Sequence, residues 1–125
     1  MKSVAQCCRV SQISKDIKQL KKRFRSVEQD VIYVERLLEA GKIQVAPYTA
    51  PYPGFDEHRI FKTRVVNTDS SKGKSGGYRL IYEECASSGV IQTVILILVY
   101  DKNMYNSETK VQAEIRTRLK AYWPR

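Results

Sequence analysis

The stretch KGKSGGYRLIYEE, residues 72–84, changes character within a few positions. It begins as a basic, glycine-rich turn and continues, from Gly77 to Glu83, with the alternation typical of a β-strand. The same alternation runs through Arg59–Val66 upstream, and an apolar run at Val90–Tyr100 follows the turn Ala86–Gly89. Three strands joined by short loops most simply form an antiparallel meander. The continuous apolar run indicates that the third strand is buried in a central position.

Helical spacing replaces this alternation in the first third of the chain. Two amphipathic runs meet at the capping-box pattern S-x-x-Q, residues 26–29, and Gly41 is a typical helix stop. Their apolar positions recur at the helical period: Ile13, Ile17, Leu20 and Phe24 in the first run, and Val27, Val31, Val34 and Leu38 in the second. The sequence therefore predicts a helix hairpin.

Three further segments complete the predicted order of elements. Val4–Val10 is a candidate opening strand, and a last helix is expected to begin at Ser107. Val45–Gly54 holds three of the four prolines, which exclude a helix and favour an extended surface loop. We thus predict one α+β domain over residues 1–125, with an N-terminal strand and helix hairpin packed on a small antiparallel sheet and a C-terminal helix.

The net charge of +9 on 125 residues indicates a polyanionic partner. Nucleic acid is the leading candidate, followed by an acidic protein and then by an anionic membrane surface. Met1–Val10 lacks the apolar core of a signal peptide, and the most apolar run, Thr93–Tyr100, is far shorter than the roughly 20 residues that span a bilayer. We expect a soluble cytoplasmic protein without a membrane partner.

The chain offers few residues for metal or thiol chemistry. Its three cysteines show no C-x-x-C spacing and are expected to be small apolar residues in or beside strands. His58 is the only histidine and is expected on the surface or in a loop. Glu83 and Glu84 are expected at a solvated strand end. These observations predict neither a metal site nor a small-molecule cofactor.

Alternation along the strands predicts where the cations gather. Lys62 and Arg64 share one face of their strand, and in a meander Arg79 can join them on the same side of the sheet. Tyr100 and Lys102 lie at the end of the neighbouring strand. The glycine-rich turn would let a phosphate approach main-chain N–H groups. The residues expected to contact such a phosphate or its nucleic acid are Lys72, Lys74, Gly76, Gly77 and Arg59.

These motifs resemble a known family. FKTRVVNTDSSKGKSGGYRLIYEE, followed by an apolar strand ending in LVYDKN and a helix opening with NSE, resembles the RelE-like bacterial toxins, and GKSGGYRLIY with YDK is most similar to the HigB branch. The resemblance covers about residues 56–119. It implies a compact domain with a small antiparallel sheet. It also implies a toxin that cuts mRNA in the ribosomal A site and is silenced by a cognate antitoxin protein.

Metal-free RNA cleavage needs a base for the 2′-OH, a cation for the phosphate and an acid for the leaving 5′ oxygen. By the resemblance, Arg79 matches the arginine of the GYR element, Lys62 and Arg64 the upstream basic pair, and Lys102 the basic residue after the last strand. Tyr105 is a candidate acid, base or stacking platform. The family places a further catalytic residue near the C-terminus, for which the candidates here are Tyr105, Arg116, Arg118 and Tyr122.

Two alternative functions remain open. A ParE-like toxin has a similar fold but inhibits DNA gyrase, and it usually lacks clustered cations on the sheet face. A non-catalytic basic module would bind nucleic acid or an acidic protein with strong salt dependence and would cut nothing.

Overall fold

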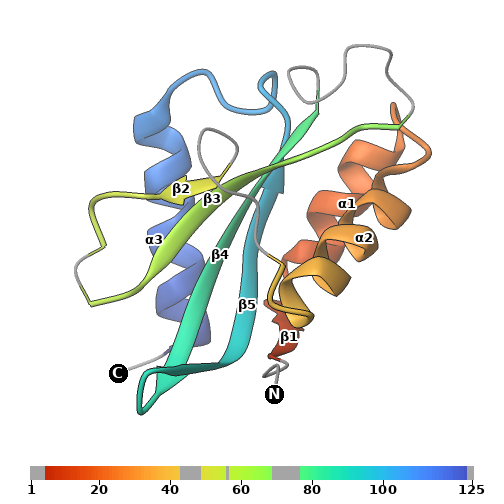
Figure 1. Ribbon diagram of the computed structural model, residues 1–125. Coiled ribbons are helices and arrows are strands. Elements are labelled where there is room, and N and C mark those ends of the chain that lie inside the picture. The colour runs from red at the N-terminus through yellow and green to blue at the C-terminus, as the bar shows by residue number, and fades with distance from the viewer. Residues whose placement is uncertain (1–4, 43–48, 56, 69–76, 124–125) are drawn as a thin grey trace.

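The computed structural model describes residues 5–42, 49–55, 57–68 and 77–123. Within these ranges the chain forms three helices and five strands (Figure 1). In chain order they are β1 (Gln6–Arg9), α1 (Ile13–Lys21), α2 (Val27–Glu39), β2 (Thr49–Pro51), β3 (Ile60–Val65), β4 (Tyr78–Ser87), β5 (Val90–Tyr100) and α3 (Glu108–Tyr122). The α+β class predicted from the sequence is confirmed.

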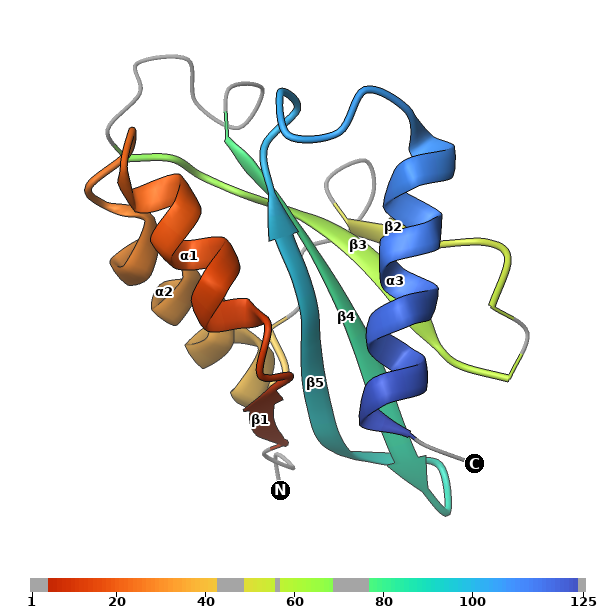
Figure 2. The same ribbon diagram turned by 180° about the vertical axis from the view of Figure 1, so that it is seen from behind.

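The sheet separates two helical layers. Figures 1 and 2 show α1 and α2 on one side of it and α3 on the other. The side chains of β4 alternate between these two sides. Tyr78 packs against Phe24, in the turn between α1 and α2, whereas Glu83 accepts a hydrogen bond from Trp123 at the end of α3. Both faces of the strands are therefore covered, and this explains why Val94 to Tyr100 of β5 are buried without interruption.

The strand order is β1-β5-β4-β3-β2. β3, β4 and β5 form the predicted antiparallel meander. β1, however, pairs with β5 in parallel, so the sheet is mixed and the prediction of an antiparallel sheet is wrong for this strand. Two helices and three strands separate β1 from β5 in the chain, so no hairpin turn fixes the direction of their pairing.

The proline-rich stretch adds an edge strand that the sequence did not predict. Thr49–Pro51 forms β2 and pairs with β3, while residues 45–48 of the expected loop lie outside the described residues. The Thr49 and Thr63 hydroxyls are 2.6 Å apart across this pairing. Pro51 is tolerated because an edge strand needs no hydrogen bonds on its outer side.

A buried ion pair occupies the edge of β5 where β1 ends. The register shifts between Ile81–Leu98 and Tyr82–Leu96, which leaves Ile97 as the extra residue of a β-bulge. Arg118 donates to the Ile97 carbonyl at 2.9 Å, and Asp16 accepts from the Val99 N–H at 3.1 Å. Side chains from α3 and α1 thus bond to strand groups that β1 does not reach.

The sequence predicted the start and end of α2 and the start of α3. Ser26 precedes α2 as predicted, but its hydroxyl makes no capping bond and instead donates to Asp30 at 2.8 Å. Gly41 follows α2 with a φ of 73°, which favours glycine, and so confirms the predicted stop. Ser107 caps α3 by accepting from the Lys110 N–H at 3.3 Å.

The cysteines lie in strands, as predicted. Cys7 and Cys8 belong to β1 and Cys85 to β4, and all three are half-buried free thiols. Burial, with the nearby Glu39 and Glu35, raises the pKa of Cys7 to about 12. Such a thiol is a poor nucleophile at neutral pH.

None of the helices formed by the described residues has the length and apolar character needed to cross a bilayer.

Candidate nucleic-acid interface

Cations from two neighbouring strands lie side by side on the α3 face of the sheet. Arg64 of β3 is directly opposite Arg79 of β4, and Arg79 is directly opposite Tyr100 of β5. Lys62 lies two residues before Arg64 and therefore on the same face. The predicted gathering of Lys62, Arg64 and Arg79, here named the basic row, is confirmed. All three side chains are half-buried.

The two arginines of the basic row are placed at an electrostatic cost. Directly opposed residues have Cβ atoms about 5 Å apart, and like charges there destabilise a sheet. Arg79 donates to the Gly77 carbonyl at 3.0 Å. Among the described residues, no carboxylate pairs with either Arg64 or Arg79. An anion bound between the two guanidinium groups would remove the repulsion.

The glycine before Arg79 has a structural role. Gly77 is buried, and a Cβ at this position would lie 2.0 Å from the carbonyl oxygen of Val65. Only glycine lets the start of β4 come so close to the end of β3. Gly77 therefore holds the sheet together beside Arg79 and is not exposed for RNA contact as the sequence suggested. Lys72, Lys74 and Gly76, the other predicted contacts of this loop, lie outside the described residues.

The sequence reasoning missed an acidic residue at one end of the basic row. Glu108, in the first turn of α3, accepts from Tyr52 at 3.0 Å and from Lys62 at 3.4 Å, both through Oε2. Lys62 also lies over the Tyr52 ring, 5.3 Å from its centroid. The NSE motif marked the helix start, and acidic residues are common in a first turn. Only the packing of α3 on the sheet shows that this carboxylate reaches the cations.

Two tyrosines extend the basic row on the β5 side. Tyr105 packs edge-on against Tyr100, with ring centroids 5.5 Å apart. Burial raises the pKa of Tyr100, Glu108 adds to the rise, and Arg79 opposes it. Burial also raises the pKa of Tyr105, again with a nearby carboxylate, Glu114, adding to it. Both phenols stay protonated at neutral pH and suit proton donation better than proton abstraction.

Other predicted residues are not part of this cluster. Arg59, just before β3, points to the opposite face, because it lies three positions before Lys62 and five before Arg64, and there it pairs with Glu84 at 3.3 Å. Lys102 is exposed beyond the end of β5. Arg118 is buried against Asp16 and so cannot meet a substrate. Arg116 and Tyr122 lie further along α3, away from Glu108.

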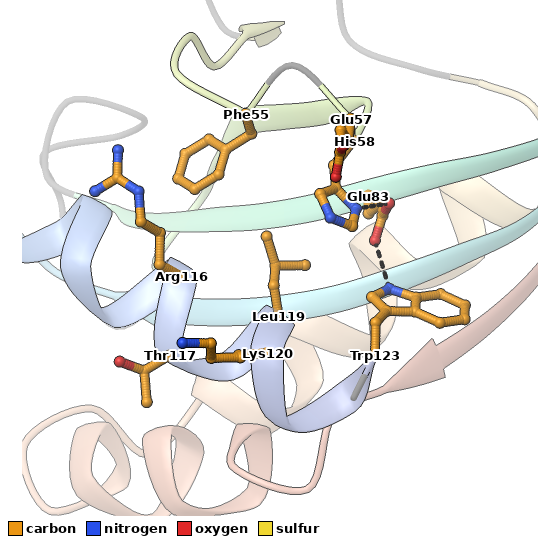
Figure 3. Close-up of a pocket in the computed structure, with 9 residues that line it drawn as sticks. All are labelled: Phe55, Glu57, His58, Glu83, Arg116, Thr117, Leu119, Lys120 and Trp123. Atoms are coloured by element: carbon orange, nitrogen blue, oxygen red, sulfur yellow. Dashed lines mark hydrogen bonds and ion pairs between the residues drawn. The ribbon is translucent and has the colours of Figure 1, made fainter. Parts of the chain in front are cut away.

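A groove opens beside the C-terminal half of α3 on the same face of the sheet (Figure 3). His58 Nδ1 lies 2.6 Å from Glu83 Oε2, and the Trp123 indole N–H donates to Glu83 Oε1 at 3.0 Å. Glu83 is only 6% exposed, and Glu84 is equally buried, so the expected solvated strand end is wrong. His58 and Trp123 cover Glu83 on the α3 face, whereas Glu84 points to the opposite face and pairs there with Arg59.

The described residues contain no group of three or more His, Cys, Asp or Glu side chains that could hold a metal ion. Comparison of the chain with protein-family models, curated proteins and solved structures found no match. The described residues form a small α+β domain whose mixed sheet carries the basic row on its α3 face.

Proposed function

We propose that this protein is a RelE-like toxin of a toxin–antitoxin pair, which cuts mRNA on the ribosome without a metal ion. The observation that carries the proposal is the juxtaposition of Arg64 and Arg79, two cations held together without a carboxylate partner among the described residues. A phosphodiester is the ligand whose charge and geometry fit paired guanidinium groups. The motif resemblance and the net charge of +9 point to the same substrate.

The proposed reaction is an internal transesterification of RNA. The 2′-oxygen attacks phosphorus, the bond to the 5′-oxygen breaks, and the products are a 2′,3′-cyclic phosphate and a 5′-hydroxyl. Arg79 and Arg64 stabilise the charge that grows on the phosphate oxygens. Glu108, oriented by Lys62 and Tyr52, takes the proton from the 2′-hydroxyl. Tyr105 gives a proton to the leaving 5′-oxygen.

The same charged face suits both partners. The ribosome presents RNA, so the remaining cations, Lys102 among them, assist docking through phosphate contacts. A cognate antitoxin would neutralise the toxin by covering the basic row with acidic residues.

Controlled expression in a bacterium tests this function. The wild type should stop growth within one or two doublings, and 5′-end mapping of a reporter mRNA should show new cuts in register with the reading frame. Arg79→Ala should abolish both. Arg36→Ala is the matched control, because it removes one exposed arginine from α2, on the other side of the sheet, and should leave both intact.

Each other outcome contradicts the proposal in a defined way. Growth arrest without new RNA ends would replace it with the gyrase-inhibiting function. Soluble expression without arrest would leave a basic binding module. Cuts that persist in Arg79→Ala would remove the basic row from the active site.

A further inference from the structure

The groove beside α3 is large enough for a small organic ligand. Its volume is about 730 Å³, and it lies between the segment before β3 and the last turns of α3 (Figure 3). The lining residues are Phe55, Glu57, His58, Glu83, Arg116, Thr117, Leu119, Lys120 and Trp123. None of them belongs to the basic row or to the proposed catalytic group.

Aromatic side chains form the apolar part of the groove. Figure 3 shows Phe55 and Trp123 at opposite ends, with Leu119 between them. Phe55 is held by stacking on Tyr52, with ring centroids 6.0 Å apart, and Trp123 by its bond to Glu83. Trp123 is 38% exposed and lines the groove, so part of the indole is accessible to a planar ligand.

The charges in the groove are separated. Arg116 and Lys120 lie one turn apart on α3, are exposed, and have no carboxylate partner among the described residues. The Arg116 guanidinium lies 5.2 Å from the centre of the Phe55 ring. Glu57, Glu83 and His58 gather on the far side of the groove (Figure 3). A ligand that fits this pattern is anionic at one end and carries hydrogen-bond donors at the other.

We propose that this groove binds one nucleotide of the RNA substrate. The base lies against the indole of Trp123, its exocyclic amino group donates to Glu57, and the phosphate rests on Arg116 and Lys120. Base–aromatic stacking and cationic phosphate contacts are the usual means of holding single-stranded RNA. The acidic side of the groove favours adenine, cytosine and guanine, which carry exocyclic amino groups, over uracil, which has none.

This inference rests on the proposed function, because it takes the nucleotide from a strand already held at the basic row. Arg79 and Glu83 lie on the same face of β4, four residues and therefore about 14 Å apart. The groove is then a subsite a short stretch of RNA away from the cut, and it gives the nuclease a base preference at that position.

Trp123 provides a direct test, because it is the only tryptophan of the chain and its fluorescence therefore reports on the groove. The full-length protein is titrated with AMP, CMP, UMP and inorganic phosphate. We expect saturable quenching by AMP and CMP, about tenfold weaker binding of UMP, which has no exocyclic amino group to donate to Glu57, and no quenching by phosphate.

Variants separate the groove from general charge effects. Arg116→Gln with Lys120→Gln should weaken AMP binding at least about tenfold, since it removes two charged hydrogen bonds. Lys110→Gln, on the same helix but outside the groove, is the matched control and should change nothing. Thermal unfolding of each variant verifies that it is folded.

RNA cleavage and nucleotide binding in the groove respond to different variants. Arg79→Gln should abolish RNA cleavage and leave AMP binding unchanged. No saturable quenching, equal affinity for UMP, or equal weakening by Lys110→Gln would overturn the nucleotide subsite even where the wild type cuts RNA. Quenching by phosphate alone would reduce the groove to an anion site and would likewise overturn it.

Discussion

Arg118 and Arg79 show how differently one small protein uses the same side chain. Arg118 is 4% exposed, and its guanidinium bonds to Asp16 at 2.5 and 2.8 Å, to Glu114 at 2.8 Å and to the Ile97 carbonyl. Arg79 is half-buried and donates, among the described residues, to one backbone carbonyl. Another arginine, Arg64, lies directly beside it on the neighbouring strand. The first is a satisfied charge, and the second is a charge with binding capacity left.

Partner count, more than residue type, separates a cation that holds the fold together from one that can still bind an anion. Burial opposes the charge on Arg118, but its hydrogen bonds to Asp16 raise its pKa above the ordinary value. Burial raises the pKa of Asp16, and Arg118 opposes that rise. Each charge is tolerated because of the other, and together they complete the edge of β5.

Of the substitutions considered, Arg118→Ala should have the largest effect, and that effect is on stability. It leaves Asp16 buried without its partner and the Ile97 carbonyl without a donor, so we expect a loss of about 3–5 kcal/mol in the free energy of unfolding. Urea unfolding measures it. Only the Val99 N–H then opposes the effect of burial on the pKa of Asp16, so its folded pKa lies further above its unfolded pKa. The variant should therefore regain stability as pH falls, because the folded state binds the extra proton.

Two further variants test whether the ion pair, and not arginine in general, stabilises the fold. Asp16→Leu with Arg118→Met removes both charges but still leaves Ile97 and Val99 without partners, so it should remain less stable than the wild type. A double variant as stable as the wild type would show that the pair does not complete the strand edge. Arg79→Ala should change stability by less than about 1 kcal/mol, since it also relieves the repulsion from Arg64.

The sequence predicted the features that depend on local patterns. Alternation placed Lys62, Arg64 and Arg79 on one face, and the apolar run marked β5 at its observed bounds. It missed contacts between segments far apart in the chain. Asp16 and Arg118 are 102 residues apart, and Glu108 and Lys62 are 46 apart. In the sequence each of these carboxylates looked like an ordinary helix-surface charge, because only tertiary packing brings the partners together.

Glu108→Gln tests whether the carboxylate beside the basic row is used in chemistry. The amide keeps the shape but cannot take a proton, so the single-turnover cleavage rate should fall about 100-fold. Binding of an uncleavable 2′-deoxy substrate should stay the same or tighten, because a negative charge beside the cations is removed. A residue that only shields Lys62 would give tighter binding with an undiminished rate, and that result would exclude Glu108 as the base.

Arg64→Gln should give the smallest effect, which concerns how binding depends on salt. Each phosphate contact to single-stranded RNA contributes about 0.7 to the slope of log affinity against log salt concentration. Losing Arg64 should lower that slope by about this amount. Arg59→Gln is the matched control, because Arg59 immediately precedes the same strand but pairs with Glu84 on the opposite face. If the two variants lower the salt-dependence slope equally, RNA does not distinguish the two faces of the sheet. That result would exclude the basic row as the specific binding surface.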